Sequence, residues 1–150
     1  MAGQWDIFCA VVDNYGDIGV TLRLARQLVA EQGVAVRLWV DDLRALKPLS
    51  PATSLTAAQQ WLEGVEVRAW TAESVSGVEP GEVVIEAFAC ELPAAFIAAM
   101  AARPRPPLWL NLEYLSAEDW VAGCHALPSP QPCGLRKFFF FPGFTEGTGG

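Results

Sequence analysis

Residues 7–20 read Ile7-Phe8-Cys9-Ala10-Val11-Val12-Asp13-Asn14-Tyr15-Gly16-Asp17-Ile18-Gly19-Val20. The apolar beginning is typical of a buried strand, and residues 20–31 repeat apolar side chains at helical spacing. A strand followed by a tight glycine turn and a helix opens a parallel α/β sheet, whose ligands bind at the carboxyl ends of the strands. Asp13 and Asp17 come at that end, so they are our first candidate functional residues.

The remaining chain continues the alternation of strands and helices. We expect strands at 5–12, 34–40, 65–70, 83–87, 108–112 and 138–141, and helices at 20–31, 93–102 and 116–121. Gly33 is expected to end the first helix, and residues 42–64 and 125–132 read as loops, the first with short helical pieces. This order predicts an α/β fold with a Rossmann-like, doubly wound and mostly parallel sheet of roughly six strands.

The composition limits the class of protein. The chain has 150 residues, is 52% hydrophobic and carries a net charge of -7, which indicates one folded domain with a sizeable core. An acidic chain lacks the basic face of a nucleic-acid binder and is better suited to a basic partner. No run approaches the roughly 18 apolar residues of a membrane span, and the N-terminus lacks the basic start of a secretory signal. We therefore expect a cytoplasmic protein with no membrane or nucleic-acid partner.

The sequence contains no pattern typical of a metal site. The four cysteines form no CxxC pair, and His125 is the single histidine. We expect reduced thiols, no bound metal and no catalytic role for His125.

Two interpretations of the glycine turn are open. The backbone amides of Gly16 and Gly19 could face an anionic ligand at the start of a helix. However, the spacing is not G-x-G-x-x-G, and Asp17 would repel a pyrophosphate, which argues against a nucleotide-dependent oxidoreductase.

The two aspartates also have two interpretations. Asp17 could simply cap the helix and Asp13 could be a turn residue. Alternatively, they form a paired-carboxylate site in which one acid orients a cationic or hydroxyl group and the other takes its proton.

Further polar residues follow other predicted strands. Asp41 ends the second strand, and Asn111, Glu113 and Tyr114 belong to the end of the fifth, so we expect them at the same sheet edge as Asp13, unless they form only a solvated strand end. We expect Trp39 and Trp109 in the core or cleft wall, and the phenylalanine run 138–141 in a strand buried on both faces.

Several long segments resemble one family, the bacterial protein-arginine rhamnosyltransferases that mature elongation factor P (EarP). The similar segments are Trp5 to Cys9, Val11 to Val20, Arg23 to Leu28, Arg37 to Leu43, Asn111 to Glu118 and Phe139 to Thr145. One departure is Thr21-Leu22, where the family pattern leads us to expect a tryptophan before Arg23.

The resemblance implies the N-terminal domain of a GT-B glycosyltransferase. Residues 1–142 would form a Rossmann-like acceptor-binding domain, and residues 143–150 would begin a linker to a C-terminal donor-binding domain absent from this chain. The family moves rhamnose from dTDP-β-L-rhamnose, its donor substrate, to an arginine of elongation factor P with inversion at the anomeric carbon. No cofactor is implied.

The resemblance also implies site residues. The family's two essential aspartates match Asp13 and Asp17. Acceptor binding is assigned to Asn14, Tyr15, Asp41, Asn111, Glu113 and Tyr114, and the backbone of Gly16 and Gly19 to the donor side. A protonated guanidinium is a poor nucleophile that pairs well with carboxylates, so Asp17 is assigned as the base, or as a carboxylate that localises the positive charge on one nitrogen, and Asp13 as the orienting acid. The alternative is a non-catalytic module that binds a basic partner.

Overall fold

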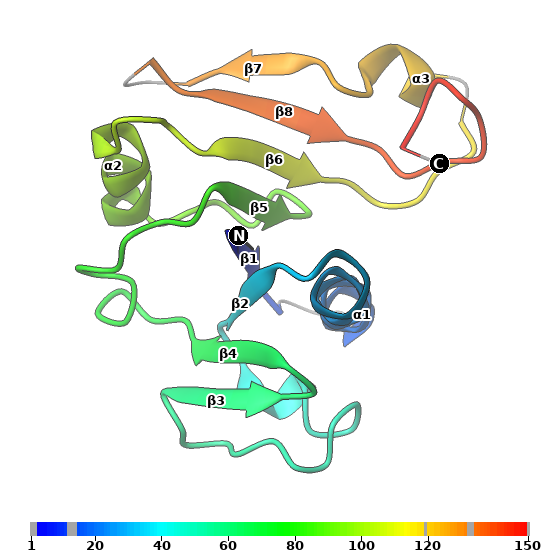
Figure 1. Ribbon diagram of the computed structural model, residues 1–150. Coiled ribbons are helices and arrows are strands. Elements are labelled where there is room, and N and C mark those ends of the chain that lie inside the picture. The colour runs from blue at the N-terminus through cyan, green and yellow to red at the C-terminus, as the bar shows by residue number, and fades with distance from the viewer. Residues whose placement is uncertain (1–2, 12–14, 119, 132–133, 150) are drawn as a thin grey trace.

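A computed structural model describes residues 3–11, 15–118, 120–131 and 134–149, with only the backbone of Tyr15. In these ranges the chain forms one sheet of eight strands in the order β3-β4-β2-β1-β5-β6-β8-β7 (Figure 1). The strands are β1 Gln4–Cys9, β2 Ala35–Val40, β3 Gln59–Leu62, β4 Val65–Ala69, β5 Val83–Ala87, β6 Leu108–Leu112, β7 Pro128–Pro130 and β8 Arg136–Phe140. The helices are α1 Tyr15–Gln32, η1 Leu43–Ala45, α2 Ala94–Ala102 and α3 Trp120–Cys124.

The inner part of the sheet is parallel, as predicted. From β1 the chain adds β2 and then β4 on one side, and later adds β5, β6 and β8 on the other side, all in parallel pairs. The direction of winding therefore reverses between β1 and β5. In open α/β sheets such a switch point forms a crevice at the carboxyl ends of the strands, where ligands bind.

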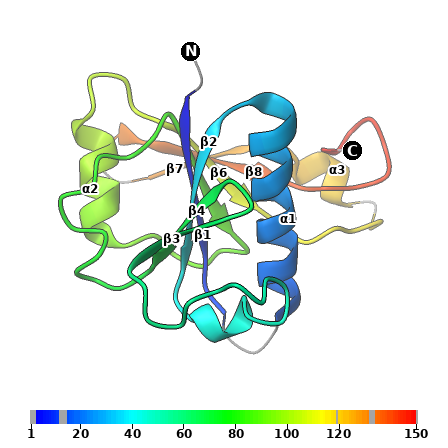
Figure 2. The same ribbon diagram turned by 60° about the horizontal axis from the view of Figure 1, so that its bottom comes forward.

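Helices cover both faces of the sheet, so the doubly wound prediction is confirmed. Figure 2 shows α1 on one side and α2 on the other. The α1 side buries aliphatic residues such as Ile7, Leu22 and Leu38. The α2 side buries larger side chains, with Phe8 stacked on Trp39 at a ring-centroid distance of 5.4 Å. Trp39 and Trp109 were expected in the core or in the cleft wall, and both are core residues.

The glycine turn predicted before a helix at 20–31 is wrong at its described end, because helix α1 already begins at Tyr15. Gly16 and Gly19 both lie inside the helix, and glycine's low helix propensity explains why the sequence suggested a turn. The helix ends at Gln32, and Gly33 follows with φ +65°, the left-handed conformation expected of a C-terminal glycine.

Two antiparallel edge strands, β3 and β7, were not predicted. Strand β3 joins β4 through Glu63 and Gly64, whose φ angles of 50° and 85° suit a two-residue hairpin turn. This hairpin was not predicted because Glu-Gly is a less typical turn pair than Asn-Gly. Strand β7 begins and ends with a proline, which edge strands tolerate because one side of an edge needs no amide donors.

The C-terminal part differs in two further details. Helix α3 begins at Trp120 rather than Ser116, and the Ser116 hydroxyl instead accepts the Glu118 N–H at 3.1 Å. Asp119, which was expected to complete a weak capping box with Ser116, lies outside the described residues. The phenylalanines of β8 are half-buried rather than buried on both faces. The main contacts of β8 are with the strands β6 and β7, and in the described ranges neither α1 nor α2 packs extensively on it.

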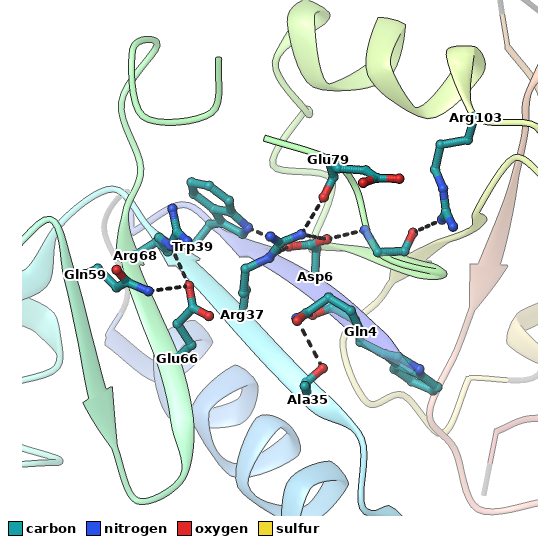
Figure 3. A network of polar contacts seen from close by, with 12 residues as sticks. Gln4, Asp6, Ala35, Arg37, Trp39, Gln59, Glu66, Arg68, Glu79 and Arg103 are labelled. Atoms are coloured by element: carbon teal, nitrogen blue, oxygen red, sulfur yellow. Dashed lines mark hydrogen bonds and ion pairs between the residues drawn. The ribbon is translucent and has the colours of Figure 1, made fainter. Parts of the chain in front are cut away.

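A buried ion pair fixes the amino-terminal half of the sheet. Asp6 of β1 is fully buried and accepts two hydrogen bonds from the Arg37 guanidinium, at 2.7 and 2.9 Å (Figure 3). Its carboxylate also accepts Trp39 Nε1–H at 2.9 Å and the Gly81 N–H at 2.7 Å. Four donors on one carboxylate offset the loss of its hydration, so this acid is structural.

A second buried acid, Glu86, interrupts the apolar run of the strand predicted at 83–87. Glu86 of β5 is 1% exposed and pairs with Lys137 of β8 at 3.1 Å. Lys137 also lies 5.1 Å from the centre of the Trp109 ring. This ion pair crosses β6 and links β5 to β8 on the α2 side of the sheet.

Cys9, Cys90 and Cys124 are free thiols, in line with the expected reduced state, whereas Cys133 lies outside the described residues. Within the described ranges, none of the helices is both long enough and apolar enough to cross a bilayer.

Candidate functional site

The start of α1 and the end of β6 meet at the carboxyl edge of the sheet. Asp17 lies in the first turn of α1, and Tyr114 lies two residues beyond β6. The Tyr114 hydroxyl donates a hydrogen bond of 2.9 Å to Asp17 Oδ2 across 97 positions of sequence. The structure therefore brings together two of the predicted site residues.

The environment of Tyr114 is partly apolar and negatively charged. Its ring stacks on Phe88 with centroids 4.2 Å apart and planes 14° apart. Burial first, and then the hydrogen bond and charge of Asp17, raise the pKa of Tyr114 above its usual value of 10.0. The phenol therefore remains a protonated donor to Asp17 at neutral pH.

Asn111 and Glu113 form the next part of the site. Asn111 is 1% exposed, its Oδ1 accepts the Ala89 N–H at 2.9 Å, and its Nδ2 donates to Glu113 Oε1. The buried amide thus connects the end of β6 to the loop after β5. Glu113 is half-buried, and its carboxylate is held towards Asn111 by this bond.

Asp41 supports the loop that leads to the first aspartate. Its Oδ1 accepts the Val11 N–H at 2.7 Å, so β2 holds the chain two residues before Asp13. The following Asp42 pairs with Arg44, and this bond holds the pKa of the half-buried Asp42 carboxyl below its usual value. An open pocket of about 330 Å³ lies beside these residues, lined by Val40, Asp41, Asp42, Leu43, Arg44, Leu55, Ala69, Trp70 and Thr71.

The role of the loop after β5 was not predicted from the sequence. Phe88 and Ala89 both have φ 54°, and Glu91 has φ 62°, although none of them is glycine. Left-handed backbone at a bulky residue is energetically costly and is often found at functional sites. Residues 88–91 contain no glycine, so nothing in their sequence predicts a left-handed backbone.

Some predicted site residues are not described. Asp13, Asn14 and the side chain of Tyr15 lie outside the described part of the chain. Gly19 lies beyond the first turn of α1, where each N–H bonds to the carbonyl four residues back, so this position does not favour its predicted role towards a donor. The role of Gly16 in the first turn stays a prediction.

His125 is used structurally. Its Nδ1 accepts the Phe141 N–H at 3.0 Å, and its ring meets Phe140 edge-on. Among the residues that the structure describes, no group of three or more histidine, cysteine, aspartate and glutamate side chains is arranged to hold a metal ion.

Cys9, the last residue of β1, lies near Asp17 and Asp41. Its thiol makes the free energy of unfolding depend on pH in the alkaline range. Burial, together with the charges of Asp17 and Asp41, outweighs a hydrogen bond with Thr21 and raises the pKa of the Cys9 thiol from 9.0 to about 11. The folded state therefore keeps a proton that the unfolded state loses between pH 9 and 11. In that window we expect Cys9 to lower the free energy of unfolding by ~1.4 kcal/mol per pH unit.

Urea unfolding between pH 9 and 11 measures this effect. Cys9→Ala should show a smaller fall of stability with pH than the wild type. Val40→Ala, which truncates the neighbour of Cys9 on β2, should lower stability at every pH but keep the wild-type slope. Equal slopes in all three proteins would exclude the role of Cys9.

The chain is thus a Rossmann-like α/β domain with acidic and aromatic side chains gathered at the switch point of its sheet. A sequence profile of the family described as "Elongation-Factor P (EF-P) rhamnosyltransferase EarP" matches residues 5–150. The chain belongs to this family.

Individual relatives agree with the family. The chain is 72% identical over 150 residues to a protein-arginine rhamnosyltransferase of Pseudomonas putida, covering 100% of the chain and 40% of that protein. It is 64% identical over 147 residues to the Pseudomonas aeruginosa protein of the same name (98% and 39%). A Neisseria meningitidis relative of that name is 45% identical over 146 residues (96% and 37%). The chain therefore spans about two fifths of the length of these curated relatives.

Proposed function

We propose that this chain is the acceptor-binding part of an inverting glycosyltransferase that moves rhamnose from dTDP-β-L-rhamnose to an arginine of translation elongation factor P. Membership of the EarP family supports the reaction class. The hydrogen bond between Tyr114 and Asp17 carries the assignment of the site, because it joins the carboxyl ends of the central strands around an acid that an arginine could approach.

In the proposed reaction, a nitrogen of the acceptor guanidinium attacks the anomeric carbon of rhamnose. The new carbon–nitrogen bond forms as the bond to the diphosphate oxygen breaks, and dTDP leaves with that electron pair. Asp17 takes the proton that the attacking nitrogen loses, or localises the positive charge on another nitrogen. Asp13 holds and orients the guanidinium through its carboxylate. The sugar passes through an oxocarbenium-like state.

In this proposal, different parts of the chain have different functions. Residues 1–142 bind the acceptor, with Asn14, Tyr15, Asp41, Asn111 and Glu113 around it, and residues 143–150 begin the connection to a donor-binding domain. The net charge of -7 suits a partner that presents an arginine. We place the reaction in the bacterial cytoplasm, without a membrane or nucleic-acid partner.

Mass spectrometry of elongation factor P tests the proposal. The full-length enzyme, meaning this chain together with the remainder of its relatives' length, is incubated with elongation factor P and dTDP-β-L-rhamnose. We expect a mass increase of one deoxyhexose on a single arginine. Binding of elongation factor P without any such increase would instead support the non-catalytic binding module.

A further inference from the structure

Tyr114 and Phe88 form an aromatic step beside Asp17. Tyr114 is 54% exposed, and behind it the Phe88 ring is stacked at 4.2 Å and packs against the core on the α1 side. One face of Tyr114 is therefore supported by another ring, while much of the side chain faces solvent. An exposed tyrosine held in this way presents a preorganised surface for a ligand.

The position of Phe88 is determined by its strained backbone. Phe88 and Ala89 both have φ 54°, and two hydrogen bonds keep them there. The Phe88 N–H donates to the Leu112 carbonyl at 2.7 Å, and the Ala89 N–H donates to Asn111 Oδ1 at 2.9 Å. The buried Asn111 side chain thus fixes the turn that brings the Phe88 ring against Tyr114. Strain held by several such contacts is typical of functional sites.

The hydroxyl of Tyr114 adds a fixed relation to a charge. Because it donates to Asp17 Oδ2 at 2.9 Å, the aromatic ring and the carboxylate are held next to each other. A guanidinium is planar, stacks on aromatic rings and pairs with carboxylates, whereas an ammonium is a compact and strongly hydrated charge. A ring face next to a carboxylate therefore favours arginine over lysine.

We propose that Tyr114, supported by Phe88, is the surface on which the acceptor guanidinium stacks, and that it selects arginine over lysine. Phe88 and Asn111 are positioning residues, because they act through Tyr114. This inference rests on the proposed function, since it names the group that determines which side chain the acceptor presents.

Acceptor kinetics with three variants of the full-length enzyme test the proposal. Tyr114→Leu removes the ring and the hydroxyl, Tyr114→Phe removes only the hydroxyl, and Phe88→Leu removes the supporting ring. Trp61→Leu is the matched control, because Trp61 is 63% exposed on β3 at the far edge of the sheet. Tyr114 is exposed, so its replacement should leave the fold intact.

We expect Tyr114→Leu to raise the KM for elongation factor P roughly 2- to 30-fold, the range of a cation–π contact. Tyr114→Phe should keep a KM near the wild-type value because the ring remains, and any loss should appear in kcat. Phe88→Leu should raise the KM by less than Tyr114→Leu. Trp61→Leu should match the wild type.

The binding of an acceptor whose modified arginine is replaced by lysine measures selectivity. The wild type should prefer the arginine form, and Tyr114→Leu should lose most of that preference. The proposal is overturned if Tyr114→Leu behaves like Trp61→Leu, or if Tyr114→Phe raises the KM as much as Tyr114→Leu does. If the wild-type enzyme itself transfers no rhamnose, the proposed function fails instead, so the two failures are distinguishable.

Discussion

Asp17→Asn is expected to lower the rate of rhamnose transfer by about 10²- to 10⁴-fold in the full-length enzyme, the usual contribution of a general base. The amide has nearly the shape of the carboxylate and can still accept the Tyr114 hydroxyl. It cannot take a proton or balance the positive charge of a guanidinium. The loss should therefore appear in kcat, measured from the rate at which modified elongation factor P accumulates.

Glu31→Gln provides the matched control. Glu31 is an exposed acid at the other end of the same helix, so its replacement makes the same change of charge away from the site. We expect this control to transfer rhamnose at the wild-type rate. Full activity of Asp17→Asn would show that Asp17 is not the base.

Arg37→Met is expected to lower the free energy of unfolding of this chain by ~3–5 kcal/mol. The change leaves the fully buried Asp6 carboxylate with only Trp39 and the Gly81 N–H as the donors described above. Because small domains are stable by only about 5–15 kcal/mol, the loss should be large in urea unfolding monitored by tryptophan fluorescence.

Arg44→Met is the corresponding control for an exposed pair. The Arg44 side chain is 78% exposed where it pairs with Asp42, and such surface pairs contribute ~0–1 kcal/mol. Replacing both members of the buried pair, as in Asp6→Leu with Arg37→Met, should restore part of the lost stability. Equal effects of Arg37→Met and Arg44→Met would mean that the buried pair does not hold β1 to β2.

The parallel part of the fold could be predicted because its signals are local. Apolar runs at β5 and β6 matched the observed strands residue for residue, and Gly33 ended α1 as expected. The start of α1 was missed because two glycines lower helix propensity, which packing against the sheet overrides. Edge strand β3 was missed because Gln59 and Gln60, half of its residues, are polar and its strand character comes from pairing with β4.

The candidate site could be predicted only in part. The rule that parallel strands end at one edge predicted Tyr114 at the edge of Asp13 and Asp41. In the structure Tyr114 contacts Asp17, which is 97 positions away in the sequence. The same rule says nothing about which contacts form there. The left-handed turn at Phe88 depends on hydrogen bonds that the Phe88 and Ala89 N–H groups donate to Leu112 and Asn111. No pattern in residues 88–91 predicts these bonds. The family resemblance, and not the spacing of the acids, supplied the reaction.

A double-mutant cycle between Asp17 and the acceptor arginine examines whether this edge of the sheet holds the guanidinium. Calorimetry would measure the affinity of the full-length enzyme for elongation factor P, using the wild type and Asp17→Ala. Each is paired with the natural acceptor and with one whose modified arginine is replaced by alanine. A coupling energy of at least ~1 kcal/mol is expected for a direct charge pair. Losses that simply add, with no coupling, would show that the arginine binds elsewhere.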